Sequence, residues 1–190
     1  MTKHNSIVGE INAWAMRDGL FLGLVGILTL TAWRMSVVQR MGDILFLLLL
    51  LSGPVASVVL TRRYRNAVAA EEGFTFTRGF MHALFTGFYA SIWVSLAMFV
   101  YLQYLDHGVL FAAYAQMVYS PEGMQAAGQI DPRWTAMLDS LSGGRGAAGL
   151  SEALRGVGAA TYSVMPIYGA LVVGPVVSVV AGWLCQRKLY

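Results

Sequence analysis

The hydrophobic positions of this chain fall into four long, nearly uncharged runs rather than into the short alternating segments typical of β-strands. The runs are residues 19–38, 44–61, 80–105 and 163–184. The second and fourth contain no charged side chain, and the first contains a single arginine, Arg34, near its end. A helix of about twenty apolar residues is long enough to cross the hydrocarbon core of a bilayer. The pattern therefore predicts an all-α, polytopic membrane protein with four transmembrane helices.

Two segments outside these runs also have helical patterns. Within residues 1–18, Ile7, Ile11 and Trp14 share one helical face, which predicts a short amphipathic helix lying on the membrane surface before the first span. In residues 106–162, the stretches "YSPEG" and "DPR" each place a capping residue before a proline, the usual start of a helix. We expect this segment to be a partly helical loop of two or three short helices, resting in part on the membrane.

Composition supports a membrane location for the whole chain, which we interpret as a single membrane domain spanning residues 1–190. Only 12% of its 190 residues are charged and 57% are hydrophobic, whereas about a quarter of the residues in soluble domains are charged. The net charge of +3 is small, and the basic residues are not interleaved with aromatic ones, so nucleic-acid binding is not expected. The single cysteine, Cys185, excludes an internal disulfide and a multi-cysteine metal site.

Basic residues predict the orientation of the spans. Positive charge accumulates in short cytoplasmic loops, and the regions that four spans would place on one side hold eight of the thirteen basic residues. Both termini are therefore predicted to be cytoplasmic, with residues 106–162 on the outer side of the membrane. The residues that would mark the cytoplasmic side are Arg62, Arg63, Arg65, Arg78, Arg187 and Lys188.

Small residues recur at every fourth position in three of the runs. This spacing lets helix backbones approach closely in lipid, where the hydrophobic effect contributes little to association. It predicts packing ridges that join spans within one chain or two copies of the chain as a homodimer, and the spacing does not separate the two uses. The positions are Gly19, Gly23, Gly79, Ala83, Gly87, Ser91, Ala170, Gly174, Ser178 and Gly182.

Four polar residues in or beside the spans are candidates for a function: Arg34, His82, Asp106 and His107. Ionisable groups at membrane depth are costly and often functional. For Arg34 the simpler interpretation is an interfacial anchor, and for His82 a hydrogen-bonded histidine near the inner surface. Asp106 and His107 are neighbours in sequence and would point apart on a helix. The chain contains no HExxH, phosphate-binding loop or GxSxG motif, so no catalytic, cofactor-binding or metal-binding residue is predicted.

Several stretches resemble a known family. They are "RDGLFLGLVGILTL", "RRYRNAVAAEEGFTFTRGFMHALFTG", "YLQYLDHG" and the glycine-rich last run with its basic end. Together they are similar to small bacterial integral membrane proteins of domain-of-unknown-function family 4199. The resemblance covers most of the chain and implies a fold and a location in the bacterial inner membrane, which would place residues 106–162 in the periplasm. It implies no catalytic residue. The chain departs from the family pattern at His107, where a proline is expected, and in the glycine-rich insert near Gly143.

These observations leave two functional hypotheses and argue against a third. The first is a non-catalytic scaffold, assembly factor or accessory subunit of a membrane complex. The alternative is a small homodimeric transporter or lipid-handling protein. It would need polar groups lining a path, and only a few serine and threonine side chains are available for this: Thr29, Thr31, Ser52, Ser57, Thr86, Ser91, Ser95 and Ser178. An enzyme is not expected because no reactive constellation is visible. The expected partners are the lipid bilayer and either another membrane protein or a second copy of the chain, with no cofactor, metal or nucleic acid.

Overall fold

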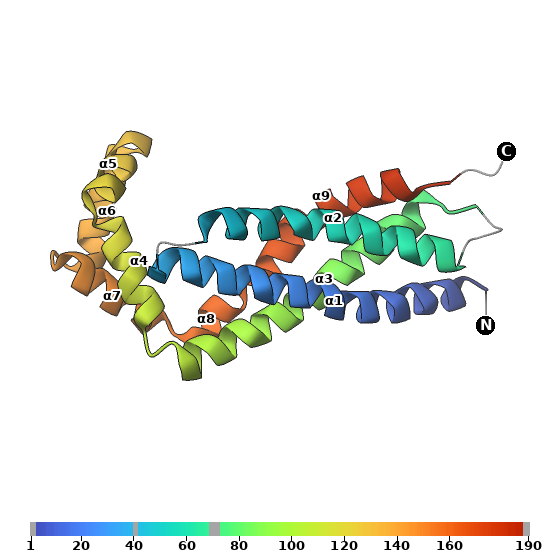
Figure 1. Cartoon of the computed structure of the whole chain (residues 1–190), viewed down its shortest axis with the longest axis horizontal. Coiled ribbons are helices and arrows are strands. Elements are labelled where there is room, and N and C mark those ends of the chain that lie inside the picture. The colour runs from blue at the N-terminus through green and yellow to red at the C-terminus, as the bar shows by residue number, and fades with distance from the viewer. Residues whose placement is uncertain (1–2, 40–41, 69–72, 188–190) are drawn as a thin grey trace.

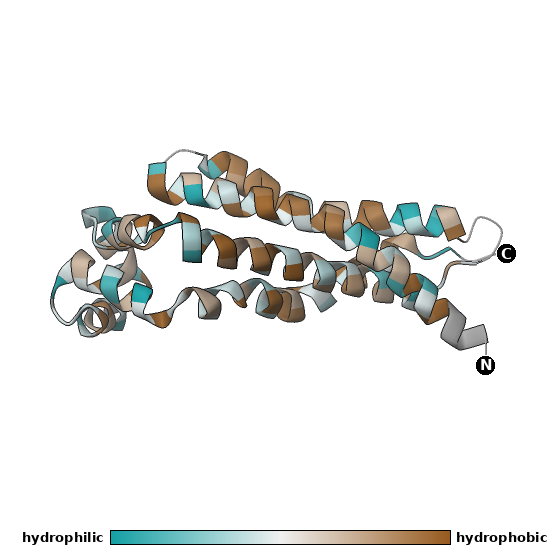
Figure 2. Cartoon of the chain, turned by 90° about the horizontal axis from the view of Figure 1, so that it is seen from below, coloured by the Kyte–Doolittle hydropathy of each residue, from teal (hydrophilic) through white to brown (hydrophobic). Residues whose placement is uncertain are grey.

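Four long helices form a bundle, and a group of shorter helices joins the third to the fourth (Figure 1). The computed structural model describes residues 3–39, 42–68 and 73–187. Within these ranges, four helical segments are long and apolar enough to cross a membrane, as the sequence predicts. The long helices are α1 (Lys3–Gln39), α2 (Asp43–Val68), α3 (Phe76–Val100) with its π-helical continuation η1 (Tyr101–Leu105), and α9 (Met165–Cys185), which the short α8 (Ala159–Ser163) precedes. Hydrophobic residues predominate along the middle of the bundle (Figure 2).

The first helix differs from the sequence prediction. Residues 1–18 were expected to form a separate helix on the membrane surface, but α1 continues without a break from Lys3 to Gln39. The reason is packing: Ile11 and Ala15 are buried, and Ile11 belongs to a hydrophobic cluster with Tyr64 of α2. The face that the sequence assigned to lipid head groups therefore packs against other helices. At 37 residues, α1 is about 55 Å long.

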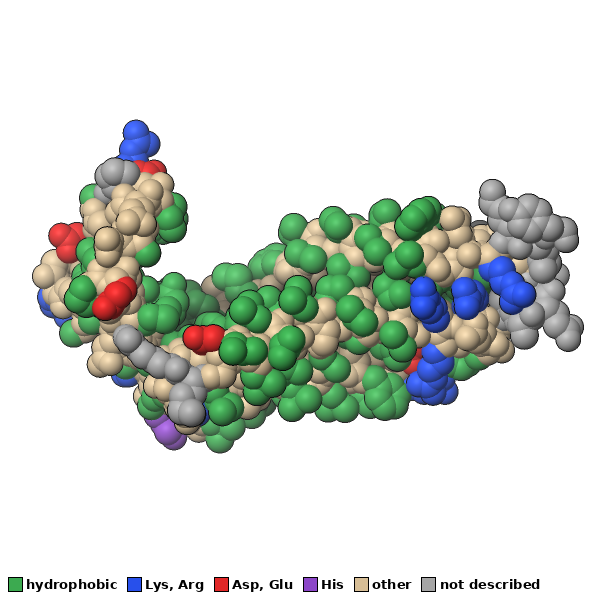
Figure 3. Space-filling model, turned by 45° about the horizontal axis from the view of Figure 1, so that its top comes forward, with side chains coloured by type: hydrophobic (Ala, Val, Ile, Leu, Met, Phe, Trp, Pro, Cys, Tyr) green, Lys and Arg blue, Asp and Glu red, His purple; other side chains and the backbone are tan. Residues whose placement is uncertain are grey.

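The arginines assigned to the loop between the second and third spans lie within helices. Arg62, Arg63 and Arg65 occupy the last turns of α2, which extends seven residues beyond the predicted end at Thr61, and Arg78 lies in the first turn of α3. The helix continues because Tyr64 is fully buried between these exposed or half-buried arginines. Basic side chains gather at this end of the molecule in Figure 3.

Both termini lie at the end of the bundle that carries these arginines (Figure 1). Arg187 pairs with Phe74 through two backbone hydrogen bonds, of 3.0 and 2.9 Å, and so joins the C-terminal segment to the start of α3. Lys188, the last residue of the predicted basic set, lies outside the described residues.

The predicted loop is more helical than expected and lies at the opposite end of the bundle (Figure 1). Both predicted caps are present: the Ser120 hydroxyl accepts a hydrogen bond from the Gly123 amide at 3.0 Å, and the Asp131 carboxylate accepts one from the Arg133 amide at 2.8 Å. We call this segment the cap, residues 106–163. Besides α8, it contains α4 (Val109–Val118), α5 (Pro121–Ile130), α6 (Pro132–Ser142) and α7 (Gly146–Val157).

Glycines bring α3 close to two neighbours. A Cβ atom added to Gly19 of α1 would lie 2.5 Å from Tyr89 Cβ of α3, and one added to Gly23 would lie 2.9 Å from Trp93 Cβ. At the other side of α3, a Cβ on Gly79 would lie 3.1 Å from the Cα atom of Gly182 in α9. Such approaches leave no room for a side chain, since non-bonded carbon atoms prefer about 3.5–4.0 Å. The glycines therefore set the spacing of α3 from α1 and from α9.

Candidate functional site

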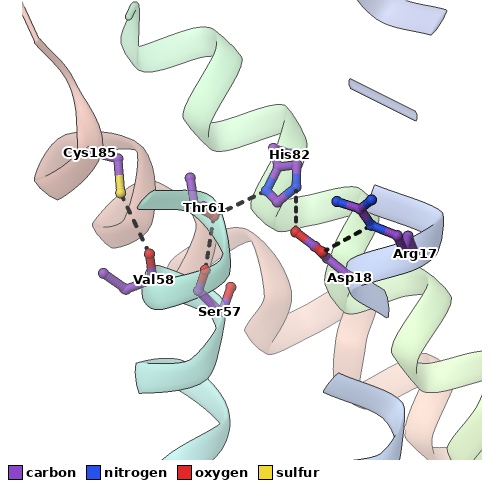
Figure 4. A network of polar contacts seen from close by, with 7 residues as sticks. All are labelled: Arg17, Asp18, Ser57, Val58, Thr61, His82 and Cys185. Atoms are coloured by element: carbon purple, nitrogen blue, oxygen red, sulfur yellow. Dashed lines mark hydrogen bonds and ion pairs between the residues drawn. The ribbon is translucent and has the colours of Figure 1, made fainter. Parts of the chain in front are cut away.

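A polar cluster is buried where α1, α2 and α3 meet near the arginine-bearing end of the bundle (Figure 4). Asp18 of α1 and His82 of α3 are both 0% exposed, and their Oδ2 and Nε2 atoms are 3.4 Å apart. The other ring nitrogen of His82, Nδ1, lies 3.2 Å from the Thr61 hydroxyl of α2. Thr61 in turn donates to the Ser57 carbonyl oxygen at 2.9 Å. Three of the four long helices thus contribute side chains to one continuous set of polar contacts.

Aromatic rings pack against the histidine side of this cluster. The Tyr64 ring stacks on the His82 ring, with centroids 4.5 Å apart and planes 8° from parallel. Trp14 and Phe74 contact the Tyr64 ring at centroid distances of 5.8 and 5.7 Å. The imidazole is therefore held in one orientation by the ring on its face and by polar contacts at both of its nitrogens.

Asp18 is an unusual residue to bury. Removing an ionised carboxylate from water costs several kcal/mol unless it is well paired, and in the described part of the chain neither Asp18 oxygen accepts a hydrogen bond. The nearest basic side chains are His82 and the half-exposed Arg17, whose Nε atom is 4.0 Å from Asp18 Oδ1. Costly burial without full pairing is typical of functional groups at membrane depth.

A second polar network lies at the opposite end of the bundle and again joins α1 to α3. Arg34 Nε of α1 donates to the Tyr101 hydroxyl at 3.0 Å, and that hydroxyl donates to Asp106 Oδ1 at 2.6 Å. Asp106 is 2% exposed and also accepts from the Leu110 amide in the first turn of α4, at 3.0 Å. The network anchors the cap to the bundle, because Asp106 bonds both to η1 and to α4.

The structure separates the four sequence candidates into different roles. His82 is buried beside Asp18, whereas Arg34 and Asp106 are joined through Tyr101. His107 is exposed and lies in a turn, with a positive φ of 47°. Arg34 is not only an interfacial anchor, since its guanidinium donates to a side chain of another helix.

Sequence reasoning missed Asp18 because it assigned residues 1–18 to the membrane surface. One signal was available: Asp18 follows Ile11 by seven residues and so shares its helical face, together with Ala15. Both of those residues are buried. A charged residue on the same helical face as buried apolar residues is expected to face the interior of the protein, and Asp18 does so in the structure.

A groove lies among the four long helices, in the middle of the bundle. Its volume is about 520 Å³, and residues of α1, α2, α3 and α9 line it. Leu51 of α2 and Val173 of α9 border it and are 66% and 57% exposed, so the groove opens between these two helices. The lining contains many small residues, among them Gly26, Gly53, Ala83, Gly87, Ala90, Ser91, Gly169, Ala170 and Gly174.

The groove changes the interpretation of the small-residue ridges. Gly87 and Gly174 were expected to be close helix contacts, but a Cβ on Gly87 would meet nothing within 4 Å and one on Gly174 only Leu84 Cδ1 at 3.9 Å. Ala83, Ser91 and Ala170 line the same groove. Gly19, Gly23, Gly79 and Gly182 are at close contacts, and Ser178 is buried and donates to the Gly174 carbonyl oxygen at 2.7 Å. The middle of the ridge on α3 therefore forms a wall of the groove, and its start forms a helix contact.

Two smaller cavities continue the groove toward the cap. One, of about 310 Å³, shares Gly26, Thr29, Val94 and Pro166 with the groove. The next, of about 280 Å³, shares Trp33 and Met98 with that cavity and is also lined by residues of α4 and α7. Three neighbouring apolar pockets thus follow one another from the middle of the bundle to residues of α4 and α7.

The described residues contain no group of three or more His, Cys, Asp or Glu side chains that could hold a metal ion.

A family model described as "protein of unknown function (DUF4199)" matches residues 17–187. The chain belongs to this DUF4199 family. Neither a curated protein nor a solved structure matches the chain. The DUF4199 match begins at Arg17 and so includes Asp18, His82, the groove and the cap.

Proposed function

We propose that this protein is a non-catalytic, multi-pass membrane protein that binds the hydrocarbon chain of a lipid in the groove among its four long helices. The groove is the observation on which this proposal is based. Its lining is almost entirely apolar, and it opens between two helices that are apolar and long enough to cross a bilayer. Its volume of about 520 Å³ lies within the roughly 300–1,000 Å³ of small-molecule sites. In a bilayer, the molecules adjacent to such an opening are lipids.

The continuation toward the cap supports a long ligand. A hydrocarbon chain in the groove can extend through the cavity beside Trp33 toward the space under α4 and α7. Arg34 and Thr31 line a further cavity of about 280 Å³ that shares Leu30 and Trp33 with this path. These two polar side chains lie where the polar head group of such a lipid would reach the membrane surface.

The proposal also places the protein in the bacterial inner membrane with both termini in the cytoplasm. Support comes from the arginines gathered at the end that carries the termini, where anionic head groups of the cytoplasmic leaflet add favourable contacts. In this orientation the cap lies in the periplasm, and the buried Asp18–His82 pair lies near the cytoplasmic boundary of the hydrocarbon core.

The experiment compares Gly87→Leu with Gly156→Leu. A side chain at Gly87 projects into the groove, whereas Gly156 is exposed in α7, and a Cβ at either position would meet nothing within 4 Å. Each protein is purified in a mild detergent, and bound lipid is counted by native mass spectrometry and by lipid extraction. We expect Gly87→Leu to remain folded, with a cooperative thermal transition, and to lose most of the lipid that the unchanged protein and Gly156→Leu retain.

Equal lipid retention by both variants would contradict lipid binding in the groove. Absence of lipid from the unchanged protein, when it is purified from membranes without a delipidating wash, would contradict it as well.

A second candidate, an accessory subunit or scaffold of a membrane complex, is favoured by the surface of the cap. Four large apolar side chains there are 44–78% exposed: Ile130, Trp134, Met137 and Leu141. Apolar side chains exposed in this way are typical of contact surfaces. Co-purification of an unrelated membrane protein at equal stoichiometry, lost in a Trp134→Ser and Leu141→Ser double variant, would support this role.

A further inference from the structure

The hydrogen bonds around Thr61 determine which nitrogen of His82 carries a proton. The Thr61 hydroxyl has one hydrogen and two neighbouring acceptors, the Ser57 carbonyl oxygen at 2.9 Å and His82 Nδ1 at 3.2 Å. The shorter contact is the bond that threonine ordinarily makes to the carbonyl one turn earlier in its own helix. With that hydrogen committed to Ser57, the 3.2 Å contact is a hydrogen bond when Nδ1 donates to the Thr61 oxygen, and we assign a proton to Nδ1 on this basis.

This assignment leaves two acceptors facing each other. A neutral imidazole carries hydrogen on only one nitrogen, so with Nδ1 protonated the Nε2 atom presents a lone pair to the Asp18 carboxylate 3.4 Å away. An ionised carboxylate is also only an acceptor. Two buried acceptors at this distance repel each other, and a single proton between them removes the repulsion.

We propose that Asp18 and His82 together form a binding site for one exchangeable proton at the inner end of the groove. The proton is shared within the pair, either as an imidazolium beside a carboxylate or as a carboxylic acid that donates to Nε2. In both forms the pair is neutral overall, which is consistent with two side chains that are 0% exposed. The inference is independent of lipid binding, since it depends only on the contacts of the pair.

Charged and titratable groups face the cluster from every helix packed around it. Cations predominate among them, and Arg63 and Arg17 act electrostatically on Asp18. The groups are Glu10 and Arg17 of α1, Arg63 and Tyr64 of α2, Arg78 of α3 and Cys185 of α9. Burial of the carboxylate favours its neutral form, and the two arginines near it oppose this effect by favouring the ionised form.

The site has a short route to water. Asp18 is about 31 Å from Gln39 along α1, which is close to the thickness of a hydrocarbon core, and the adjacent Arg17 side chain is 50% exposed. On release, the O–H or N–H bond breaks and the proton passes to water, leaving the carboxylate facing the Nε2 lone pair. The resulting repulsion acts between α1 and α3, beside Ser57 and Ala83, which line the groove.

The tautomer of His82 tests the proposal directly. The chain has three histidines, and a His82→Gln spectrum assigns the signals of His82 in protein labelled with ¹⁵N-histidine and held in lipid nanodiscs. Between about pH 5 and 8, we expect Nδ1 of His82 to carry a proton in the unchanged protein. A neutral His82 with its proton on Nε2 would overturn the proposal, because Nε2 would then be an ordinary donor to an ionised Asp18.

The variant Asp18→Asn again distinguishes a proton on Nδ1 of His82 from a proton on Nε2. Its amide can donate to Nε2, so we expect a neutral His82 with the proton on Nδ1 throughout this pH range. A proton on Nε2 in this variant would overturn the proposal, because it would show that Nε2 is a donor to residue 18 irrespective of charge.

Stability provides a second measurement with a defined sign. In the unfolded chain, aspartate and histidine release their protons below about pH 7, so above that pH the folded state binds one proton more than the unfolded state. Stability then falls with rising pH, and the unfolding equilibrium constant rises about tenfold per pH unit while the folded pair keeps its proton. We expect Asp18→Asn to lose this dependence. An equal pH dependence in both proteins would overturn the proposal.

Discussion

The substitution Gly19→Ala tests whether glycine sets the spacing between α1 and α3. The added Cβ atom would lie 2.5 Å from Tyr89 Cβ and 3.2 Å from the Thr86 carbonyl oxygen. Because non-bonded carbons prefer about 3.5–4.0 Å, the two helices must separate locally by about 1 Å. Overpacking of this kind costs about 1–3 kcal/mol. It is partly offset by the gain of about 1 kcal/mol when alanine replaces glycine within a helix.

Gly9→Ala is the matched control, because it lies in the same helix and its Cβ would meet nothing within 4 Å. Both variants gain the same helix propensity, so the difference between them isolates the clash, about 1–3 kcal/mol. At about 2–4 °C per kcal/mol for a chain of this size, Gly19→Ala should melt roughly 2–12 °C below Gly9→Ala. The measurement is thermal unfolding followed by tryptophan fluorescence, with both proteins in the same detergent. Equal melting temperatures would refute close packing at Gly19.

Two further predictions concern the cap and the orientation. Asp106→Ala removes an acceptor for the Tyr101 hydroxyl and for the first turn of α4, so it should lower the free energy of unfolding by about 1–3 kcal/mol. Tyr101→Phe keeps the bond between Asp106 and α4, so it should lower the free energy of unfolding by less in the same assay. A larger loss for Tyr101→Phe than for Asp106→Ala would contradict the anchoring role. For orientation, Ser140→Cys in the cap and Ala67→Cys at the end of α2 are both exposed. With the buried Cys185 replaced by alanine, a membrane-impermeant thiol reagent should label only Ser140→Cys in intact cells, and labelling of Ala67→Cys alone would reverse the orientation.

Features governed by neighbours in sequence were predicted well. The four apolar runs appear as the four long helices, and Ser120 and Asp131 cap the helices that follow them. These features depend on the hydropathy of one segment or on a contact three residues or fewer away. The extension of α2 to Val68 was missed, because three arginines resemble a loop when the burial of Tyr64 among them is unknown.

Features that depend on how helices are arranged around one another were not predictable from the pattern. Gly19 and Gly87 have the same small-residue spacing, but one is at a close contact and the other lines the groove. A glycine leaves room for a neighbouring helix to approach, but its presence in the sequence does not show that a helix lies there. For the same reason the pairing of Asp18 with His82 was missed, since 64 residues separate them and neither is part of a recognisable motif.

The bundle has a mechanical consequence that follows from where its prolines lie. α2 contains Pro54 and α9 contains Pro175, and each proline removes a backbone hydrogen bond and favours bending. Neither α1 nor α3 contains a proline, and polar contacts fasten these two helices to each other near both ends. The molecule therefore combines two stiff helices, α1 and α3, with two helices that bend more easily, α2 and α9. Since the groove opens between α2 and α9, its opening can widen or narrow while α1, α3 and the cap anchored to them keep their relative positions.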